Sequence, residues 1–216
     1  MEMTDISRLC LVRHGETAWN AERRLQGHLD VPLNETGRLQ AEAAARSLAG
    51  HTFAALYSSD LGRARETATA AGRALALDMT IEPALRERHY GDFQGLTYDE
   101  ARARFPADYD RFHARDADFA FAGGGESLTA FAARIRRVLS RIAVAHPGEQ
   151  VLVVTHGGVL DVAHRLTSGK ALEAKRDFTI PNAALNWIEF DGGAWRLVAW
   201  ADEAHLQGAR DELPNG

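Results

Sequence analysis

The chain has 216 residues, of which 45% are apolar and 25% are charged, and its formal net charge is −5. This length suits one domain with a sizeable core, and the composition excludes a disordered, collagen-like or coiled-coil chain. A mildly acidic chain is also a poor general nucleic-acid binder, because such proteins neutralise phosphates with an excess of cations.

The cysteine content and the apolar runs bear on the cellular compartment. Cys10 is the only cysteine, so no intramolecular disulfide can form and no oxidising compartment is implied. No stretch approaches the roughly 20 apolar residues of a membrane span. We therefore expect a cytoplasmic protein that binds neither nucleic acid nor a membrane.

Short apolar runs mark the candidate strands, which are residues 9–12, 55–58, 151–154, 182–190 and 195–200. The runs at 9–12 and 151–154 are continuously apolar, as in strands of a parallel sheet that are buried on both faces. The last two candidates flank Asp191-Gly192-Gly193 and predict a hairpin. That hairpin would add antiparallel strands to the edge of the sheet.

Helical patterns lie between these strands. Glu35–Leu48 is rich in alanine, with Leu39, Ala43 and Ala44 able to line one stripe, and residues 61–77 look similar. The longest apolar helix face comprises Leu128, Phe131, Ile135, Val138, Leu139 and Ile142, and it ends at His146-Pro147-Gly148. Strands that alternate with helices predict a three-layer α/β/α sandwich, with a mostly parallel central sheet, helices on both faces and an antiparallel C-terminal edge.

We expect a single domain over residues 1–216, with its core at about 8–200. The stretch from Thr97 to Ala122 predicts a helical excursion over the sheet, and the three glycines after it are too few to form a domain linker. Phe93, Phe119 and Phe121 are expected in the core rather than in a pocket.

Two of the apolar runs end in a histidine that is followed by glycine. Residues 9–12 lead into Arg13-His14-Gly15, and residues 151–154 lead into Thr155-His156-Gly157. Ligands of open α/β sheets bind beyond the carboxyl ends of the strands, so parallel neighbours would bring both histidines to one edge. Two imidazoles and a guanidinium repel each other and lose solvation on burial, so the matched pair indicates an anion site.

Two further charged residues could serve such a site. Arg63 falls in the first turn of an expected helix, where the helix dipole disfavours a cation, so a bound anion would explain it. Glu87, in the segment Leu85-Arg86-Glu87-Arg88-His89-Tyr90-Gly91, could give a proton to a leaving alkoxide. Taken alone, Arg63 could instead be a solvated surface residue and Glu87 a member of a surface salt bridge.

Together these residues resemble the histidine phosphatase superfamily, which includes cofactor-dependent phosphoglycerate mutase, and within it the phosphatase branch. Arg13-His14-Gly15-Glu16-Thr17 is similar to the RHG signature of that family. Further segments occur in family order, namely Trp19-Asn20, Gln26-Gly27, residues 30–37, residues 58–63, residues 87–91, residues 124–127 and residues 155–158. The resemblance covers roughly residues 8–200.

The resemblance implies a phosphomonoester hydrolase that works through a phosphohistidine. His14 matches the nucleophile, and Glu87 matches the residue that protonates the leaving oxygen and then activates water. Arg13, Arg63 and His156 match the residues that hold the phosphoryl oxygens. The substrate-binding residues that it implies are Asn20, Gln26, Gly27, Arg88, His89, Tyr90 and Gly157.

The chemistry of these side chains fits that mechanism. A neutral imidazole, with a reference pKa of about 6.5, is a competent nucleophile near neutral pH. Arginines stay charged at any useful pH and can neutralise a phosphoryl group without a metal. The sequence has no HExxH or paired Cys/His spacing, so we expect no metal and no cofactor.

A hydrolase and a mutase would share this pocket. The mutases have a lysine eleven residues after the glutamate and an arginine pair on a long insertion, whereas this chain has Tyr98 there and no adjacent arginines between Tyr98 and Gly123. These departures favour a hydrolase, although the segment from Glu87 to Gly91 is mutase-like. A catalytically silent binding module is a third reading, and the complete set of His14, His156, Arg13 and Glu87 argues against it.

The expected partner is a small phosphomonoester, and a homodimer is left open. The organic part of the phosphomonoester should contact the excursion at residues 97–122. Possible contributors are Arg102, Arg104, Tyr109, Arg111, Phe112 and His113. Candidates from the family include sugar phosphates, phosphoglycerates, ribazole phosphate and phosphorylated proteins.

Overall fold

The computed structural model describes residues 6–207, and its centre is a six-stranded sheet with the order β3-β2-β4-β1-β5-β6. The strands are β1 (Ser7–Arg13), β2 (Ala55–Ser58), β3 (Met79–Ile81), β4 (Gln150–Thr155), β5 (Leu185–Phe190) and β6 (Trp195–Asp202). Neighbours among β3, β2, β4 and β1 pair in parallel, whereas β5 pairs antiparallel with both β1 and β6. The predicted parallel sheet with an antiparallel C-terminal edge is confirmed.

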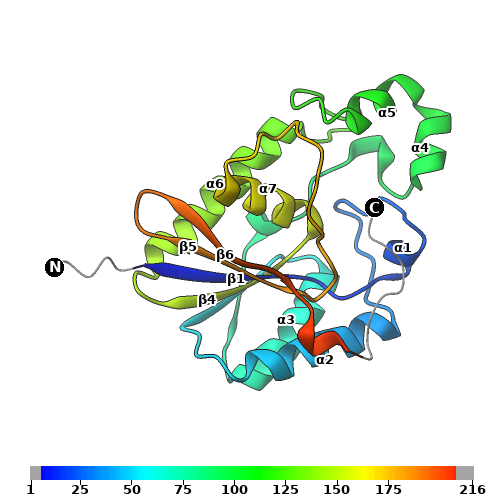
Figure 1. Cartoon of the computed structure of the whole chain (residues 1–216). Coiled ribbons are helices and arrows are strands. Elements are labelled where there is room, and N and C mark those ends of the chain that lie inside the picture. Colours follow the sequence, from blue (N-terminus) through cyan, green and yellow to red (C-terminus); the bar gives the residue numbers. More distant parts are fainter. Residues whose placement is uncertain (1–5, 208–216) are drawn as a thin grey trace.

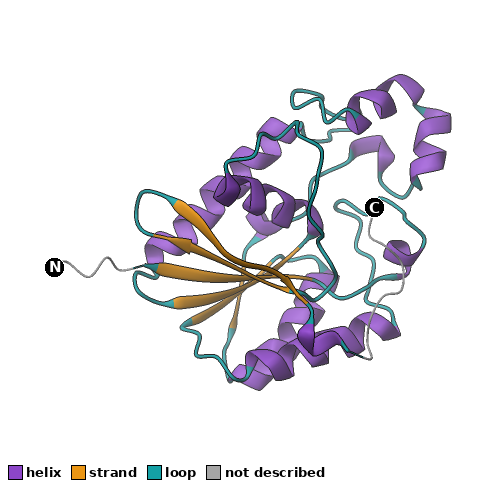
Figure 2. Ribbon diagram, in the orientation of Figure 1, coloured by secondary structure: helices purple, strands orange, loops and turns teal. Residues whose placement is uncertain are grey.

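A helix follows each parallel strand, and helices also precede β2, β3 and β4 (Figure 2). The α-helices are α1 (Ala18–Ala21), α2 (Glu35–Leu48), α3 (Gly62–Leu75), α4 (Tyr98–Arg104), α5 (Pro106–His113), α6 (Leu128–Ala145) and α7 (Gly157–Ser168). Three short 3₁₀ helices are η1 (Pro83–Leu85), η2 (Gly91–Phe93) and η3 (Ala204–Leu206). Side-chain caps fix where some of them begin; for example, the Asn34 side chain accepts from the Gly37 N–H ahead of α2.

The two faces of the sheet pack against different helices, because successive side chains of a strand point to opposite faces. Leu9 and Leu11 of β1 join an apolar cluster with α6 and α7. Cys10 and Val12 join a second cluster with α2 and α3. Figure 1 shows these two helix layers on either side of the sheet, which confirms the three-layer sandwich.

The excursion from Thr97 to Ala122 forms α4 and α5 and then a loop that returns to the start of α6. In Figure 1 it projects at the carboxyl side of β1, away from the N-terminus of that strand. Its apolar side chains pack into a separate cluster with Leu25, Phe93, Leu96, Ala101, Phe119 and Phe121. Phe93, Phe119 and Phe121, which were expected in the core, are therefore buried in this cluster.

Some local predictions are wrong. Leu39 is 58% exposed, because the buried stripe of α2 instead follows Gln40, Ala41, Ala44, Ala45 and Leu48. The strand predicted from Asn182 begins only at Leu185, since the Asn182 side chain turns toward β1 and donates to the carbonyl of His14. Strand β3 was not predicted, because it has only three residues and is largely exposed.

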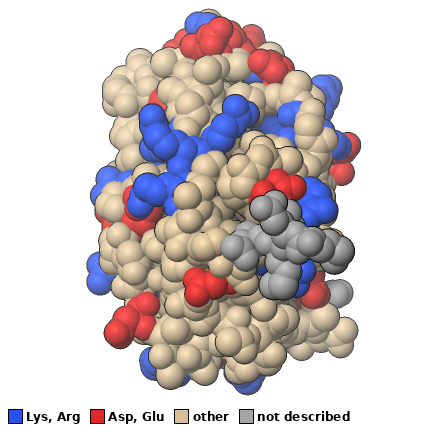
Figure 3. Space-filling view, turned by 90° about the vertical axis from the view of Figure 1, so that its left-hand side faces the viewer, with Lys and Arg blue, Asp and Glu red and all other residues tan. Residues whose placement is uncertain are grey.

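Charge is unevenly spread over the surface. Figure 3 shows one face on which Lys and Arg side chains gather across the upper half, with acidic side chains above them. The net charge of −5 therefore does not describe every face of the molecule. Among residues 6–207, no helix is both long enough and apolar enough to cross a bilayer.

Candidate active site

The two strand-end histidines meet at the carboxyl edge of the sheet. β1 and β4 are parallel neighbours in a register that pairs Arg13 with Thr155, so the next residues, His14 and His156, leave the sheet side by side. Their ring centroids lie 5.2 Å apart at an interplanar angle of 62°. Both side chains are buried. The predicted convergence of the two imidazoles is confirmed.

Hydrogen bonding fixes the tautomer of His14. Its Nδ1 lies 2.7 Å from the Gly15 carbonyl oxygen, which can only accept, so Nδ1 carries the proton and Nε2 keeps its lone pair. Burial lowers the pKa of His14 well below its usual value, and the Arg63 and Arg13 guanidinium groups lower that pKa further. The ring is therefore neutral, and its Nε2 keeps a lone pair that can accept a hydrogen bond.

Arg63 faces that nitrogen. Its Nε lies 3.2 Å from His14 Nε2, and its terminal nitrogens donate to the carbonyls of Gly27 and Leu29 at 2.8 Å. The residue is only 1% exposed, so the alternative of a solvated surface arginine is wrong. Burial lowers its pKa to about 10, which still leaves it charged near neutral pH. A buried cation of this kind is favoured by an anion beside it.

His156 is held from one side only. Its Nε2 lies 2.8 Å from the hydroxyl oxygen of Ser59, while its buried Nδ1 has no hydrogen-bond partner within residues 6–207. Burial lowers the pKa of His156 well below its usual value, as does the positive charge of Arg63. A buried polar atom without a partner is rare in proteins and marks a place for a ligand atom or water.

Glu87 reaches the same edge from the segment that follows η1. The Glu87 Oε1 accepts a hydrogen bond from the backbone N–H of Arg88 at 2.8 Å. The Glu87 Oε2 accepts one from the N–H of Gly158, at the start of α7, at 2.9 Å. A Cβ at Gly158 would lie 2.1 Å from Oε1, so only glycine allows the carboxyl group to sit there. Glu87 is thus oriented by two backbone donors.

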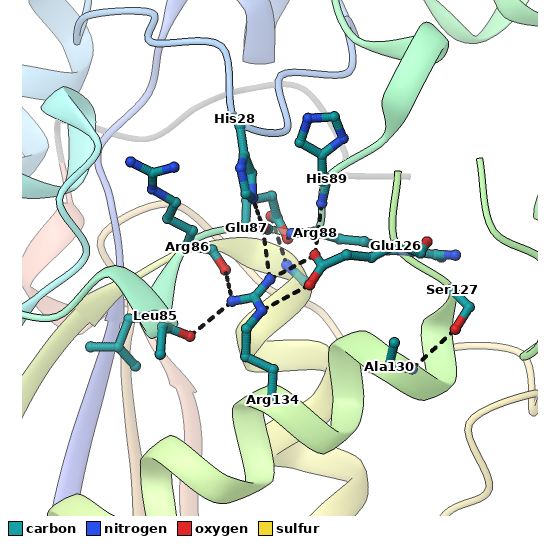
Figure 4. Close-up of polar contacts among 12 residues, drawn as sticks. His28, Leu85, Arg86, Glu87, Arg88, His89, Glu126, Ser127, Ala130 and Arg134 are labelled. Atoms are coloured by element: carbon teal, nitrogen blue, oxygen red, sulfur yellow. Dashed lines mark hydrogen bonds and ion pairs between the residues drawn. The ribbon is translucent and has the colours of Figure 1, made fainter. Parts of the chain in front are cut away.

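Arg134 of α6 holds the backbone of the segment that carries Glu87 (Figure 4). It donates to the carbonyls of Ala84, Arg86 and Glu87 at 2.8–3.2 Å, and it pairs with both carboxylate oxygens of Glu126. All five N–H donors of its guanidinium group are thereby used. The Glu87 carbonyl also faces His28 Nε2 at 2.8 Å.

A cavity of about 490 Å³ opens beside these groups. Arg13, Glu87 and Gly157 are among the residues that line it, and Arg13 is fixed by a 2.6 Å bond from Nη1 to the Ile180 carbonyl. The other residues that line it are Arg88, Tyr90, Tyr98, Phe112, His113, Arg115, Leu128, Phe131, Gly158, Asp161, Lys175, Arg176 and Ile180. This volume is typical of small-molecule sites. In the described part of the chain, no group of three or more His, Cys, Asp or Glu side chains is placed to hold a metal.

The structure places the other predicted substrate-binding residues in different ways. Tyr90, Arg88 and Gly157 line the cavity. The Arg88 guanidinium, however, donates to the Glu126 and Phe119 carbonyls and lies over the Phe121 ring, which ties the excursion to the core. His89 packs edge-on against His28 and accepts from the Gly91 N–H outside the cavity.

Three predicted residues lie on the loop after α1 or in α1 itself. Asn20 caps that helix, because its Oδ1 accepts from the Thr17 N–H. Gly27 has a φ of +54°, and its carbonyl accepts from Arg63. Gln26 is buried, with an Oε1 that has no hydrogen-bond partner in the described chain. None of the three lines the cavity, although Gly27 contacts the buried cation directly.

Sequence reasoning missed several residues that shape the site. Ser59, Asn182 and Arg134 orient His156, His14 and Glu87 through bonds that no local pattern reveals. Arg115, Lys175 and Arg176 line the cavity, and the last two belong to a loop after α7 that carried no motif. Within the excursion, Phe112 and His113 line the cavity as expected, whereas Arg102, Arg104, Tyr109 and Arg111 do not.

Comparisons with known proteins agree with this geometry. A sequence model of the family described as histidine phosphatase superfamily (branch 1) matches residues 9–203. The chain is 42% identical over 209 residues to a phosphoglycerate mutase-like protein 4 of Arabidopsis thaliana, covering 95% of this chain and 90% of the relative. It is 39% identical over 206 residues to a metal-independent phosphoserine phosphatase of the same plant, covering 94% and 84%.

A solved structure gives the same picture of the fold. The protein named YhfR of Bacillus stearothermophilus superposes with a TM-score of 0.86 at 35% sequence identity, covering 93% of this chain and 99% of that one. The match includes the sheet and the helices around it, so the site described above lies on a shared scaffold.

Proposed function

The chain belongs to the histidine phosphatase superfamily and is a phosphomonoester hydrolase that acts through a phosphohistidine, and we propose that His14 is the residue that carries the phosphoryl group. The observation that supports this most directly is the hydrogen bond from His14 Nδ1 to the Gly15 carbonyl, because it leaves the Nε2 lone pair pointing at Arg63. A nucleophile and a fixed cation are thus side by side.

In the proposed first step, His14 Nε2 attacks phosphorus and the ester P–O bond breaks. Negative charge spreads over the three equatorial oxygens, which Arg13, Arg63, His156 and the Gly157 N–H would hold. The bonding electrons go to the leaving oxygen, which takes the proton of Glu87. The protonated carboxyl group must therefore face the leaving group, and two backbone N–H donors hold the Glu87 side chain in one orientation.

In the second step, the Glu87 carboxylate takes a proton from water as the water oxygen attacks phosphorus. The N–P bond breaks, its electrons return to His14 Nε2, and inorganic phosphate leaves. Both proton transfers use one carboxyl group, so the cycle returns the enzyme to its initial protonation state. The charges that stabilise the phosphoryl group come from arginines, and the proposal includes no metal.

A phosphate-release screen over a panel of small phosphomonoesters tests this proposal. Wild type should release phosphate from several of them, including an activated aryl phosphate, and His14→Ala should lose at least about a thousandfold in turnover, as expected when a covalent nucleophile is removed. His51→Ala, at an exposed histidine outside the site, is the matched control. Equal activity of His14→Ala and wild type would reassign the nucleophile.

A mutase is the second candidate, and the name of one relative favours it. Tyr98 lines the cavity at the position where the mutases have a lysine, which argues for water as the acceptor. Supplying 3-phosphoglycerate with a bisphosphoglycerate primer separates the two reactions. We expect free phosphate to form faster than 2-phosphoglycerate, and the reverse order would identify a mutase.

The same proposal includes a small phosphorylated metabolite as the substrate and the cytoplasm as the place of action. The cavity volume supports the first, because it exceeds what a bare phosphate needs. The buried, unpaired thiol of Cys10 is compatible with the second. A homodimer stays a prediction, which sedimentation of the purified protein in an analytical ultracentrifuge would test.

A further inference from the structure

Gly15 fixes the His14 ring through its carbonyl, yet it has no side chain that could hold it in place. A Cβ at this position would lie 2.2 Å from the carbonyl oxygen of Gly37 in α2, so the fold admits only glycine there. The orientation of the Gly15 carbonyl must therefore come from hydrogen bonds to the two peptide groups that flank its Cα. The residues that make these bonds lie outside the sequence motifs described above.

The peptide group between Gly15 and Glu16 is held from α2. Its N–H, which belongs to Glu16, donates to the Oε1 of Gln40 at 2.8 Å. Its carbonyl, which belongs to Gly15, lies 2.7 Å from His14 Nδ1. The N–H and the carbonyl of a trans peptide point in opposite directions, so the bond to Gln40 aims the carbonyl at the imidazole ring. Gln40 is 1% exposed, so bulk solvent does not compete for this bond.

The peptide group between His14 and Gly15 is held from α3. Its N–H, which belongs to Gly15, donates to the hydroxyl oxygen of the buried Thr67 at 3.0 Å. The Thr67 hydroxyl in turn donates to the carbonyl of Arg63, one turn earlier in the helix, at 2.9 Å. One hydroxyl therefore links the loop that carries His14 to the helical turn that carries Arg63, whose Nε faces His14 Nε2.

From this geometry we infer that Thr67 and Gln40 are positioning residues for the nucleophile, which hold Gly15 so that its carbonyl accepts the His14 Nδ1 proton and Nε2 is directed at phosphorus. The inference rests on the proposed function, because a positioned nucleophile presupposes that His14 is one. Neither side chain lines the cavity, so both act through Gly15 and not on the substrate. Their loss should therefore slow the attack on phosphorus without weakening the binding of phosphate.

Thr67 and Thr69 provide a matched comparison, since both lie in α3 and both hydroxyls donate to the carbonyl four residues earlier. Thr67 also accepts from Gly15, whereas Thr69 is exposed. Thr67→Val keeps the shape but loses the hydroxyl. It should reduce the single-turnover rate of phosphoenzyme formation from an activated aryl phosphate about tenfold, as expected when one orienting hydrogen bond is lost. Thr67→Ser and Thr69→Val should stay within about twofold of wild type, because both keep a hydroxyl at position 67.

Two further measurements separate positioning from structural support. Inhibition by inorganic phosphate should be unchanged in Thr67→Val, because the groups proposed to hold the phosphoryl oxygens remain. In phosphate-free wild type, proton NMR should show a downfield, slowly exchanging His14 Nδ1 proton, since that proton is buried and hydrogen-bonded. Its resonance should move upfield in Thr67→Val but not in Thr69→Val. Gln40→Met, which removes the acceptor of the Glu16 N–H, should reproduce both the slower attack and the shifted resonance.

Three results would overturn the positioning role while leaving the hydrolase intact: equal rates in Thr67→Val and Thr69→Val, equal losses in Thr67→Val and Thr67→Ser, or phosphate inhibition weakened as much as the rate. Where Thr67→Val does not fold, the resonance decides. A His14 Nδ1 proton that is absent from the downfield region in wild type, or unshifted in Gln40→Met, overturns the inference. A wild type that forms no phosphoenzyme on His14 would instead overturn the proposed function, and this inference with it.

Discussion

One hydrogen bond decides which nitrogen of His14 can react. A backbone carbonyl cannot donate, so its contact with Nδ1 leaves Nε2 as the base, whatever the pH near neutrality. Burial and two neighbouring guanidinium groups then lower the pKa of the ring and keep it unprotonated. Protonating the buried His14 ring is therefore costly in free energy.

This cost predicts how stability depends on pH. Folding lowers the pKa of both His14 and His156, so below about pH 6.5 the unfolded chain binds protons that the folded chain does not. The unfolding free energy should be unaffected by these two residues above that pH. It should then fall as the pH drops toward their folded pKa values, by up to about 1.4 kcal/mol per pH unit for each.

Urea unfolding of phosphate-free protein at a series of pH values measures this slope. His14→Gln should make the slope shallower, because it removes one of the two groups, whereas His51→Gln at an exposed position should not. A slope that is the same in wild type and His14→Gln would show that His14 titrates alike in both states.

Glu87 offers a second prediction on single residues. If it protonates the leaving oxygen, Glu87→Gln should slow alkyl phosphate esters by about a hundredfold or more in the first step. It should slow that step much less for an activated aryl ester, whose leaving group needs little protonation. Single-turnover measurement of phosphoenzyme formation separates the two steps, and equal losses for both esters would remove Glu87 from the acid role.

The sequence was informative about residues wherever a motif sits at the end of a strand. His14, His156, Arg63 and Glu87 could be predicted because strand ends, helix starts and family motifs point to them. Ser59 and Asn182 could not, since each acts through one long-range bond to a histidine. Local patterns carry no signal for such a contact.

Among the elements, α6 does more than cover the sheet. Its apolar face packs into the core, while Arg134 on its flank donates to the backbone carbonyls of Ala84, Arg86 and Glu87 and pairs with Glu126. The segment has no strand or α-helix of its own at Glu87. Its position therefore depends on this arginine.

Replacing Arg134 tests that dependence. Arg134→Lys keeps the charge but cannot reach all five acceptors, so we expect about a tenfold loss of kcat or more on alkyl esters, and a smaller loss of the phosphoenzyme-forming rate on an activated aryl ester. Arg137→Lys, at an exposed position of the same helix, is the matched control. Equal losses on both esters would mean that Arg134 supports the fold rather than Glu87.

Element boundaries could be predicted where caps and periodicity agree, as for α2, which lies at the residues expected. Burial and boundaries could not be predicted where tertiary contacts determine them. Leu39 is exposed because other positions of α2 pack into the core instead. Strand β3 has only three residues, which is too short for a hydrophobic period to be visible in the sequence. The loop after α7 contains no sequence motif, yet its Lys175 and Arg176 line the cavity.

At the scale of the whole molecule, the site is assembled from both halves of the chain. β1 and β4 are far apart in sequence and adjacent in the sheet, and the excursion and the loop after α7 close the cavity above them. Such topology is predictable once two buried parallel strands are recognised, because their carboxyl ends share an edge. The residues that line the cavity cannot be predicted in this way, since they depend on how the loops pack.

The assembled site uses arginines and histidines as its charges, which predicts independence from metal ions. Activity of the purified protein should persist in excess chelator, with less than about a twofold change, because fixed guanidinium groups stabilise the negative charge on the phosphoryl oxygens. Phosphate release before and after dialysis against EDTA measures this. A loss that is restored by one divalent cation would overturn the metal-free mechanism.

The central claim is that His14 becomes phosphorylated, and trapping the intermediate tests it most directly. Wild type quenched during turnover of an activated aryl phosphate should contain an acid-labile, base-stable phosphoryl group that mass spectrometry locates on His14. Glu87→Gln should accumulate more of it, because water activation is slowed, and His14→Ala should contain none. A phosphoryl group on any other residue, or one that persists in His14→Ala, would contradict the account.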